Sequence, residues 1–293
     1  MVSHRQGVAL VTSTAAGLPA RDPEVPLIAA GLERAGLRGD VVPWDAELDW
    51  AAYELVVVRS PWDHVERLTA FRTWVAHVDT VTHIVNPADV IRWNSHKGYL
   101  VELAAHGVAT VPTTLIPGGS LDVEEQLEEC GWDEVVVGPA VGGGAGTTVR
   151  ARLSSARAIE HAQHLAHLGD VIVQRFVPEA LDHGMVSLVF FGGALSHAVR
   201  TVGTGAPDGE DREPGRPAGH RGVHEPSSPQ VRTALSALSK APGRLTYARV
   251  DLVEVDTVPS VTGLGLVEAD LFLRSTDGAA ERFVGTLVQE LDR

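Results

Sequence analysis

The sequence predicts an α/β fold whose first third contains a parallel sheet. Short, uninterrupted apolar segments alternate there with segments of helical periodicity, which is typical of strands that helices cover on both faces. The chain has 293 residues, of which 44% are apolar and 21% charged. This composition is ordinary for a globular protein with a large core. No apolar run is long enough to span a bilayer.

The first third supplies three strands and two helices. The strands are expected at residues 7–12, 55–58 and 84–85, and the helices at residues 25–35 and 68–78. Ligands of such sheets bind at the carboxyl ends of the strands. The second strand ends in Arg59, Ser60, Pro61, Trp62 and Asp63, so that strand end is a candidate ligand site.

The middle third reads as a smaller unit of strands and helices. Its elements are expected at residues 94–106 (helix), 113–115 (strand), 122–130 (helix), 134–137 and 147–150 (strands), 154–168 (helix) and 171–176 (strand). Asp122 is expected to cap the second of these helices, because an Asp side chain accepts hydrogen bonds from the free N–H groups of a helix start.

The last third is expected to contain four strands and a closing helix. These are placed at residues 186–191, 195–199, 247–255 and 263–270 (strands) and 279–291 (helix). Residues 203–226 are rich in proline, glycine and charge, and we expect a mobile loop there that covers the site.

The charge and cysteine content narrow the function classes. The chain carries 24 basic and 38 acidic side chains, a net charge of −14, which disfavours nucleic acid and anionic membranes as partners. Any phosphate therefore needs a local positive pocket. Cys130 is the sole cysteine, so no intrachain disulfide can form and a cytoplasmic protein is expected. The opening residues do not read as a signal peptide.

Three carboxylates, Asp251, Glu268 and Asp270, are expected at neighbouring strand ends. Alternation puts Glu268 and Asp270 on one strand face, where acids beside buried apolar residues are costly unless a cation lies between them. Mg²⁺ binds a few carboxylates and shares its other positions with substrate phosphates, so the pattern predicts a magnesium site. An exposed polar face is the structural alternative. Arg249 shares the face of Asp251, and either neutralises a phosphate or a substrate carboxylate or forms a plain salt bridge with these acids.

Two further features suit a phosphate. Lys97, expected in the first turn of the helix that starts at residue 94, is a point charge of the right kind, and the chain has just one other lysine. The loop Gly142-Gly143-Gly144-Ala145-Gly146 lets backbone N–H groups approach an anion closely. It is not a Walker A loop, because neither Gly-Lys-Ser/Thr nor a helix follows it. A solvated surface lysine and a loose hairpin are the structural alternatives.

The strand end at residues 59–63 combines a cation, a hydroxyl, an aromatic plane and an acid. This combination suits a small zwitterionic substrate, with Arg59, Ser60, Trp62 and Asp63 as its contacts. The structural alternative is a turn in which Asp63 caps the next helix and Trp62 packs against the core.

A series of short motifs follows almost the whole chain. They are Trp44-Asp45, Asp49-Trp50, residues 58–63, Asn86-Pro87, residues 92–97 and 111–113, the glycine loop, and residues 174–179, 196–198, 247–251 and 268–274. In this order they resemble the ATP-grasp superfamily, in its glutathione-synthetase-like branch. The likeness is greater still to the small ATP-grasp ligases of secondary metabolism, a group that includes the O-ureido-D-serine cyclo-ligase of cycloserine biosynthesis.

The resemblance implies three domains and a nucleotide held between two of them. Residues 1–93 would be an N-terminal Rossmann-like substrate domain, residues 94–176 a central lid, and residues 177–293 a C-terminal α+β domain with the magnesium site. The cofactors implied are ATP and Mg²⁺.

The resemblance also implies roles for individual residues. Lys97 would meet the nucleotide phosphates beside the glycine loop, and Arg249 would stabilise the acyl phosphate. The adenine and ribose contacts implied are Gln174, Phe176, Val177 and Glu179, and the metal ligands implied are Asp251, Glu268 and Asp270.

Three positions depart from the ATP-grasp pattern. Gly138 stands where the family usually carries a second lysine, and His183-Gly184-Met185 stands where it has Glu-Gly-Glu. Of the basic strand that follows Ser-His-Ala, Arg200 alone is kept. The missing lysine removes a charged hydrogen bond worth roughly 1.5–3 kcal/mol, unless an arginine such as Arg150 substitutes for it.

The predicted activity is that of an ADP-forming ATP-grasp ligase, cyclising or intermolecular, with a role in antibiotic biosynthesis. It would activate a small amino-acid-like carboxylate as an acyl phosphate and join it to an amine-type nucleophile. The alternative is a nucleotide-binding protein of the same fold with impaired catalysis. A monomer or a homodimer is expected.

Overall fold

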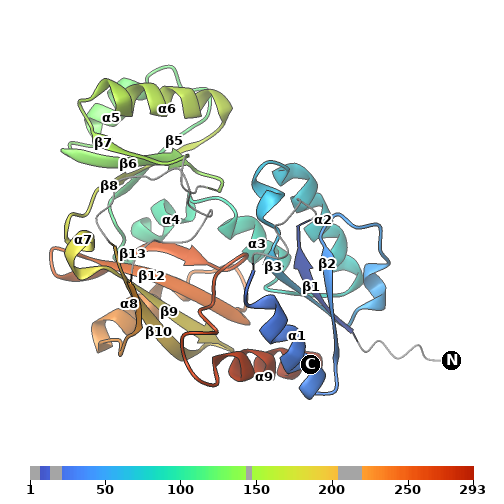
Figure 1. The fold of residues 1–293 in the computed structure, drawn as a ribbon. Coiled ribbons are helices and arrows are strands. Elements are labelled where there is room, and N and C mark those ends of the chain that lie inside the picture. The colour runs from blue at the N-terminus through green and yellow to red at the C-terminus, as the bar shows by residue number, and fades with distance from the viewer. Residues whose placement is uncertain (1–6, 14–21, 143–146, 204–219) are drawn as a thin grey trace.

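The computed structural model describes residues 7–13, 22–142, 147–203 and 220–293. These residues form three sheets, and helices cover their faces (Figure 1). The α/β class predicted from the sequence is confirmed. Each sheet draws its strands from one of the three expected domain ranges, although the boundaries themselves stay a prediction.

The N-terminal sheet is parallel, with the strand order β2-β1-β3-β4. Its strands are β1 (Gly7–Thr12), β2 (Arg38–Pro43), β3 (Leu55–Ser60) and β4 (His83–Val85), and its helices are α1 (Val25–Arg34), α2 (Leu68–Val81) and α3 (Ala88–Asn94). Strand β2 was not predicted, because it is a half-exposed edge strand whose first three residues, Arg38 to Asp40, carry no apolar side chain.

The lid sheet is antiparallel, with the order β5-β8-β6-β7, and lies at the top of Figure 1. Its elements are α4 (Tyr99–Ala105), β5 (Thr113–Ile116), α5 (Val123–Glu129), β6 (Glu134–Pro139), β7 (Val149–Arg152), α6 (Ala156–Leu168) and β8 (Val171–Arg175). Val135, Val137 and Val173 pack with α5 and α6 on one face, so the alternate residues of β6 and β8 lie on the other. Asp122 precedes α5 as expected, but its side chain bonds Gln126 rather than a backbone N–H.

The C-terminal sheet is antiparallel, with the order β11-β10-β9-β12-β13. Its elements are α7 (Glu179–His183), β9 (Met185–Phe191), β10 (Ala194–Val202), β11 (His220–Val223), α8 (Ser228–Leu238), β12 (Tyr247–Val255), β13 (Val258–Gly265) and α9 (Ala279–Leu291). Helix α8 was missed, although Ser227 and Gln230 form the capping box that marks its start. Most of the expected mobile loop, residues 204–219, lies outside the described residues.

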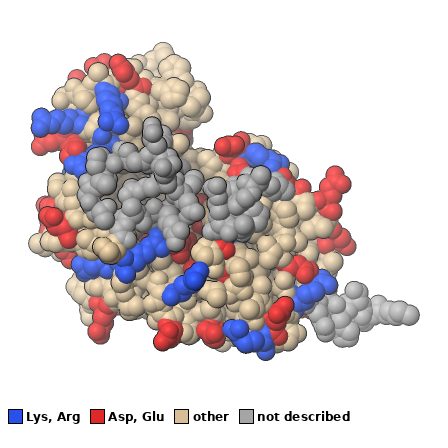
Figure 2. All heavy atoms as spheres, viewed as in Figure 1, with Lys and Arg blue, Asp and Glu red and all other residues tan. Residues whose placement is uncertain are grey.

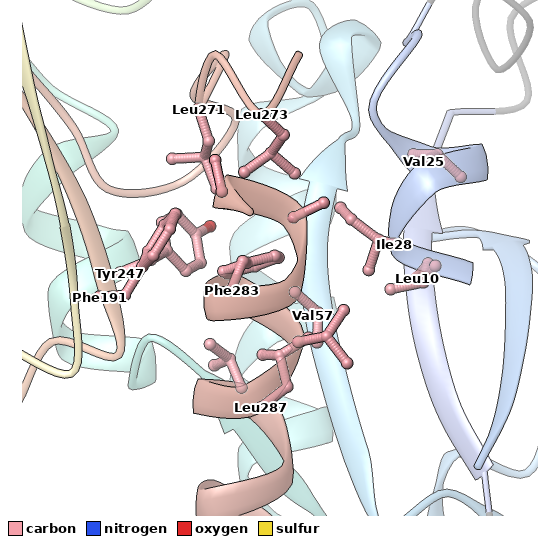
Figure 3. Packing of buried hydrophobic residues seen from close by; sticks show 14 of the residues in the cluster. Leu10, Val25, Ile28, Val57, Phe191, Tyr247, Leu271, Leu273, Phe283 and Leu287 are labelled. Atoms are coloured by element: carbon pink, nitrogen blue, oxygen red, sulfur yellow. The ribbon is translucent and has the colours of Figure 1, made fainter. Parts of the chain in front are cut away.

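Helix α9 joins the N-terminal and C-terminal units. Phe283 and Leu287 on α9 pack between Leu10 and Val57 of the parallel sheet on one side and Tyr247 on the other (Figure 3). Because one hydrophobic cluster spans both units, their relative position is fixed by burial of apolar surface. This position brings the carboxyl end of β3 close to the segment that follows β13.

Asn86 ties the same two units through their backbones. Its side chain is fully buried, donates to the carbonyls of Tyr247 (3.0 Å) and Leu266 (2.8 Å), and accepts from the N–H groups of Thr246 (2.8 Å) and Tyr247 (3.4 Å). The side chain therefore satisfies buried backbone groups that no strand partner reaches.

We expect Asn86→Ala to lower the free energy of unfolding by about 3–5 kcal/mol, because each buried polar group left without a partner costs about 1–3 kcal/mol. Urea unfolding followed by circular dichroism measures this change. Asn86→Asp keeps the acceptor but places a buried carboxylate oxygen against two carbonyl oxygens, so its effect should be at least as large. A loss below about 1 kcal/mol in Asn86→Ala would contradict this role.

None of the helices in the described ranges has the length and apolar content of a membrane-spanning helix. On the face shown in Figure 2, acidic and basic side chains are interspersed.

Candidate active site

The candidate site lies where the end of β3, the segment after β13 and the lid approach one another. His64, just after β3, has its Nε2 atom 3.8 Å from a carboxylate oxygen of Glu268, which lies after β13. Lys97 precedes α4 and is close enough to Glu268 for the two charges to interact. The structure therefore brings together residues that the sequence places far apart.

Arg249 and Asp251 on β12 form a buried ion pair at this site. The Nε and Nη2 atoms of Arg249 donate to Oδ2 of Asp251 at 3.1 and 2.9 Å, a two-pronged contact. The other oxygen of Asp251 accepts from the Ser187 hydroxyl at 2.6 Å, and Asp251 is 6% exposed. The salt bridge that the sequence left open between Arg249 and these acids is thus present.

Glu268 and Asp270 do not lie on a strand, so the prediction that a strand face carries both was wrong. Strand β13 ends at Gly265. The backbone beyond it is bound by side chains instead of a neighbouring strand: Asn94 accepts from the N–H of Leu266 (3.0 Å) and Tyr247 donates to the carbonyl of Val267 (2.5 Å). These contacts turn the chain away from the sheet, and both acids lie in the loop that follows.

Asp270 is also held by arginines. Its Oδ2 atom accepts from Arg221 at 3.1 Å, its Oδ1 atom accepts from the N–H of Phe272 at 3.0 Å, and its carbonyl accepts from Arg249 at 3.1 Å. The side chains of Glu268 and Asp270 are 35% and 33% exposed. In this structure, arginines pair with two of the three predicted metal ligands, Asp251 and Asp270, while Lys97 and Glu268 interact.

The candidate Mg²⁺ ligands at the site are the carboxylate oxygens of Asp251, Glu268 and Asp270. Among the described residues, no three His, Cys, Asp or Glu side chains are arranged so that they could hold a metal ion by themselves. Mg²⁺ is usually bound through one or two carboxylates together with substrate phosphates and water. Carboxylates are the ligand type that Mg²⁺ takes, but those of Glu268, Asp251 and Asp270 do not form a ready-made three-carboxylate cage.

Lys97 lies in the turn between α3 and α4. The helix expected over residues 94–106 begins only at Tyr99, and α3, which ends at Asn94, was not predicted. The break between the two helices follows from tertiary contacts: the N–H of Lys97 bonds the carbonyl of Ala140 (2.7 Å), and Asn94 bonds the segment after β13. The Lys97 ammonium donates to the carbonyls of Pro139 (3.4 Å) and Gly142 at the entry of the glycine loop. Burial lowers the pKa of Lys97 to about 8, and Glu268 opposes this shift.

The glycine loop connects β6 with β7, as predicted. Gly142 has a φ of +71°, and a Cβ atom there would lie 2.4 Å from Val65, so this position requires glycine. Gly143, Gly144 and Gly146 lie outside the described residues.

The expected adenine segment follows β8. Gln174 bonds the Thr113 hydroxyl (3.2 Å), and its register partner Val136 lies on the lid face opposite α5 and α6. The ring of Phe176 lies under the guanidinium of Arg150, 3.5 Å from it. Val177 is buried, and Glu179 is exposed at the start of α7. The segment therefore offers a stacked ring and backbone groups at the lid.

The four predicted substrate contacts differ in exposure. Arg59 and Ser60 are 1% and 0% exposed, and Arg59 pairs with Glu24 at 2.8 Å. Both side chains are therefore buried in this structure, and their contact with a ligand stays a prediction. Trp62 and Asp63 are half-buried, and Asp63 accepts from Trp44 Nε1 at 2.9 Å and from Arg67 at 3.3 Å.

Four residues at the site were missed: Glu24, His64, Arg221 and Phe272. Glu24 and His64 follow no sequence pattern that separates them from surface residues. Arg221 lies in a segment interpreted as a loop. Phe272, with a φ of +53°, adopts a left-handed conformation that sequence does not reveal.

Comparison with known proteins was made on the whole chain. A family model described as the N-terminal domain of D-cycloserine synthetase DcsG matches residues 8–86. The cycloserine biosynthesis protein DcsG of Streptomyces lavendulae is 32% identical over 301 residues, covering 97% of this chain and 99% of that protein. The chain belongs to the DcsG family of ATP-grasp ligases.

Solved structures agree with this assignment. The crystal structure of D-cycloserine synthetase DcsG superposes with a TM-score of 0.85 at 30% identity, over 97% of this chain and 99% of that one. D-alanine–D-alanine ligase from Bacillus anthracis matches with a TM-score of 0.73 at 12% identity, over 98% and 97% of the two chains. The ATP-grasp ligase PsnB matches with a TM-score of 0.66 at 15% identity, over 98% of both. The last two likenesses show the fold alone.

In this member of the DcsG family, the surroundings of Gly138, which stands where ATP-grasp proteins usually carry a lysine, leave little room for a side chain. A Cβ atom at Gly138 would lie 2.8 Å from the Thr148 hydroxyl, so a longer side chain requires Thr148 to move. Arg150, two residues further along β7, bonds Glu134 at 2.8 and 3.2 Å on the lid face that α5 and α6 leave uncovered. Arg150 therefore lies on this lid face, but its guanidinium is paired with Glu134 and stacked on Phe176.

Proposed function

We propose that this DcsG-family chain is an ADP-forming ligase that activates a small amino-acid-like carboxylate. The γ-phosphoryl group of ATP is transferred to a carboxylate oxygen, giving ADP and an acyl phosphate. An amine-type nitrogen then attacks the acyl carbon, the carbon–oxygen bond to phosphate breaks, and inorganic phosphate and a proton leave. The nitrogen belongs either to a second molecule or to the same one, which would close a ring.

The observation that carries this proposal is the position of Arg249. Its guanidinium is held by two bonds to Asp251 and one to the carbonyl of Asp270, so it lies between two of the predicted metal ligands. A fixed positive group costs little reorganisation when negative charge develops on a transferring phosphoryl group. Such a group beside metal-type carboxylates suits phosphoryl transfer.

The nucleotide is proposed to lie between the lid and the C-terminal sheet. Lys97 would contact its phosphates together with Gly142, Gly143, Gly144 and Gly146, while Gln174, Phe176, Val177 and Glu179 would line the adenine and ribose. Solved neighbours of the same fold contain ATP, or Mg and ADP, which supports ATP and Mg²⁺ as the cofactors.

Glu268, with Asp251 and Asp270, would hold Mg²⁺ when it arrives with ATP. When bound, the metal neutralises phosphate charge and orients the reacting oxygens. Ser187 and Arg249 fix the orientation of the Asp251 carboxylate, and Arg221 fixes that of Asp270.

The substrate is proposed to enter beside the end of β3, where Trp62 and Asp63 are half-buried. The name of the 32%-identical relative makes a cycloserine precursor the first candidate, and D-alanine follows from the name of a neighbour.

Release of ADP tests the proposed function. The purified chain with ATP and Mg²⁺ should release ADP in a coupled assay when O-ureido-D-serine, D-alanine or a member of a broader amino-acid panel is added. Mass spectrometry of the products then separates ring closure from joining of two molecules. Absence of ADP release with every candidate, in protein that binds ATP, would favour the impaired nucleotide-binding protein instead.

Nucleotide affinity should fall above pH 8, because the phosphates need a protonated Lys97. Its pKa of about 8 in the folded protein lies below its ordinary value of 10.5, so the folded protein loses this proton as the pH rises through about 8. We expect the Kd of ADP to rise about tenfold or more between pH 7 and 9.5, because a hydrogen bond to a charged group contributes roughly 1.5–3 kcal/mol. In the absence of nucleotide, the cost of burying the Lys97 ammonium is present below pH 8. The folded protein escapes this cost when Lys97 loses its proton, so the free energy of unfolding should rise between pH 8 and 10.5.

Calorimetric titrations of the wild type and of Lys97→Arg measure this dependence. A guanidinium stays protonated throughout, so the variant should keep a nearly constant Kd. Equal pH dependence in both proteins would show that another group titrates.

A further inference from the structure

Glu24 is a buried carboxylate of the N-terminal unit that contacts the loop bearing Asp270. It immediately precedes α1 and is 3% exposed. Its Oε2 atom accepts from the N–H of Leu271 at 2.9 Å, and its Oε1 atom accepts from the N–H of Leu273 at 2.7 Å. One carboxylate thus binds both residues that flank Phe272.

Arg59 holds this carboxylate in place. Its Nη2 atom donates to Oε2 of Glu24 at 2.8 Å, and the guanidinium lies 3.7 Å from Asp22. Asp22 in turn accepts from the N–H of Glu24 at 2.9 Å. A buried carboxylate is costly without a charged partner and several hydrogen bonds, and Glu24 has both.

Phe272 lies in a conformation that is unfavourable for a residue with a side chain. Its φ is +53°, and such strain persists only where the surroundings impose it. Leu271 and Leu273 are buried in the cluster around α9 (Figure 3), so both neighbours of Phe272 are fixed by packing as well as by Glu24.

The strained residue supports the reactive groups. The N–H of Phe272 bonds Asp270, and its ring lies 5.7 Å from the guanidinium of Arg249 and 5.0 Å from that of Arg221. A change of backbone conformation at Phe272 would therefore move Asp270 and remove the aromatic face beneath Arg249.

We propose that Glu24, held by Arg59, is a positioning residue that fixes the 270–273 segment and thereby places Asp270 and Arg249 for the metal-bound nucleotide. The consequence for the metal rests on the proposed function, whereas the effect on the segment does not. The role accounts for the burial of Arg59 at the end of β3, where the sequence suggested a substrate contact.

The test compares Glu24→Gln with Glu290→Gln. The amide keeps the shape of the side chain but presents an NH₂ group where an N–H and a guanidinium need an acceptor. Glu290, near the end of α9, is a matched control. It is also 3% exposed, and it is paired with Arg244 at 2.6 Å and with Arg293 at 3.0 Å. Both variants lose a buried charge.

Hydrogen exchange measured by mass spectrometry reports directly on the local stability of the 270–273 segment. In Glu24→Gln, the amide hydrogens of peptides covering residues 268–275 should exchange at least tenfold faster than in the wild type. In Glu290→Gln, their exchange rate should be unchanged. The Kd of Mn²⁺ in the presence of ADP, measured by electron paramagnetic resonance, should rise at least tenfold in Glu24→Gln alone. The Kd of ADP without metal should stay within twofold of the wild type in both variants.

Unchanged exchange over residues 268–275 in folded Glu24→Gln, or equal Mn²⁺ affinities in the two variants, would overturn the proposal. If the wild type binds Mn²⁺ with ADP but shows no enzymatic turnover, this result would count against the proposed function. The hydrogen exchange and the Mn²⁺ affinity would still decide the role of Glu24.

Discussion

Replacement of Arg249 with lysine is expected to lower kcat about 100- to 1,000-fold while the protein stays folded. Lysine keeps the positive charge that buried Asp251 needs, so the cost of an unpaired buried carboxylate, about 3–5 kcal/mol, is avoided. It cannot form the two-pronged contact or also reach the carbonyl of Asp270, so the charge is no longer fixed in place. Loss of one preorganised donor typically costs this much in rate.

Steady-state ADP release measures this loss, and thermal unfolding verifies the fold. Arg244→Lys is the control, since Arg244 is half-exposed and bonds Glu290 on α9. The KM for ATP should change little in Arg249→Lys, because the group acts on the transition state. A rate within threefold of the wild type would refute this role for Arg249.

Glu268→Gln is expected to raise the Mg²⁺ concentration for half-maximal activity at least 10- to 100-fold, and to lower kcat as well. Loss of an outer partner of a metal ligand already costs 10- to 100-fold in affinity, and loss of a direct carboxylate ligand should cost at least as much. Among the described contacts, Glu268 accepts fewer hydrogen bonds than Asp251 or Asp270, so its carboxylate has the most lone pairs left for a metal.

Titration of activity with Mg²⁺ at saturating ATP gives this dependence. Glu254→Gln serves as the control, because Glu254 is a similarly exposed carboxylate on β12 that faces His183, 3.4 Å away. The thermal stability of Glu268→Gln should equal that of the wild type or exceed it, since an acid is removed from a group of acids. An unchanged Mg²⁺ dependence would remove Glu268 from the metal site.

The sequence was sufficient for most strands and helices, because their apolar residues follow the periodicity that burial imposes. The helix and strand bounds that were predicted wrongly share a physical cause. The helix expected from residue 94 starts only at Tyr99, and the N–H of Lys97 before it bonds the distant carbonyl of Ala140. The strand expected through Glu268 ends early, because the side chains of Asn94 and Tyr247 bind the backbone of residues 266–267. Such contacts override local propensity, and they cluster at the candidate site.

The identity of the charged residues at the site was predictable, but only part of their pairing was. The pairing of Arg249 with Asp251 was one of two alternatives, because both lie on one strand face, whereas nothing local reveals that Arg221 pairs with Asp270. Arg59 likewise reads as a ligand contact at a strand end, and only the path of the chain before α1 places Glu24 beside it.

The most direct test of acyl phosphate formation follows oxygen from the substrate to phosphate. The enzyme, ATP and Mg²⁺ are incubated with a carboxylate substrate labelled with ¹⁸O in both oxygens, and the inorganic phosphate is analysed by mass spectrometry. Activation by phosphorylation predicts one ¹⁸O atom in each phosphate released and one phosphate per ADP. Release of ADP with unlabelled phosphate would contradict the account.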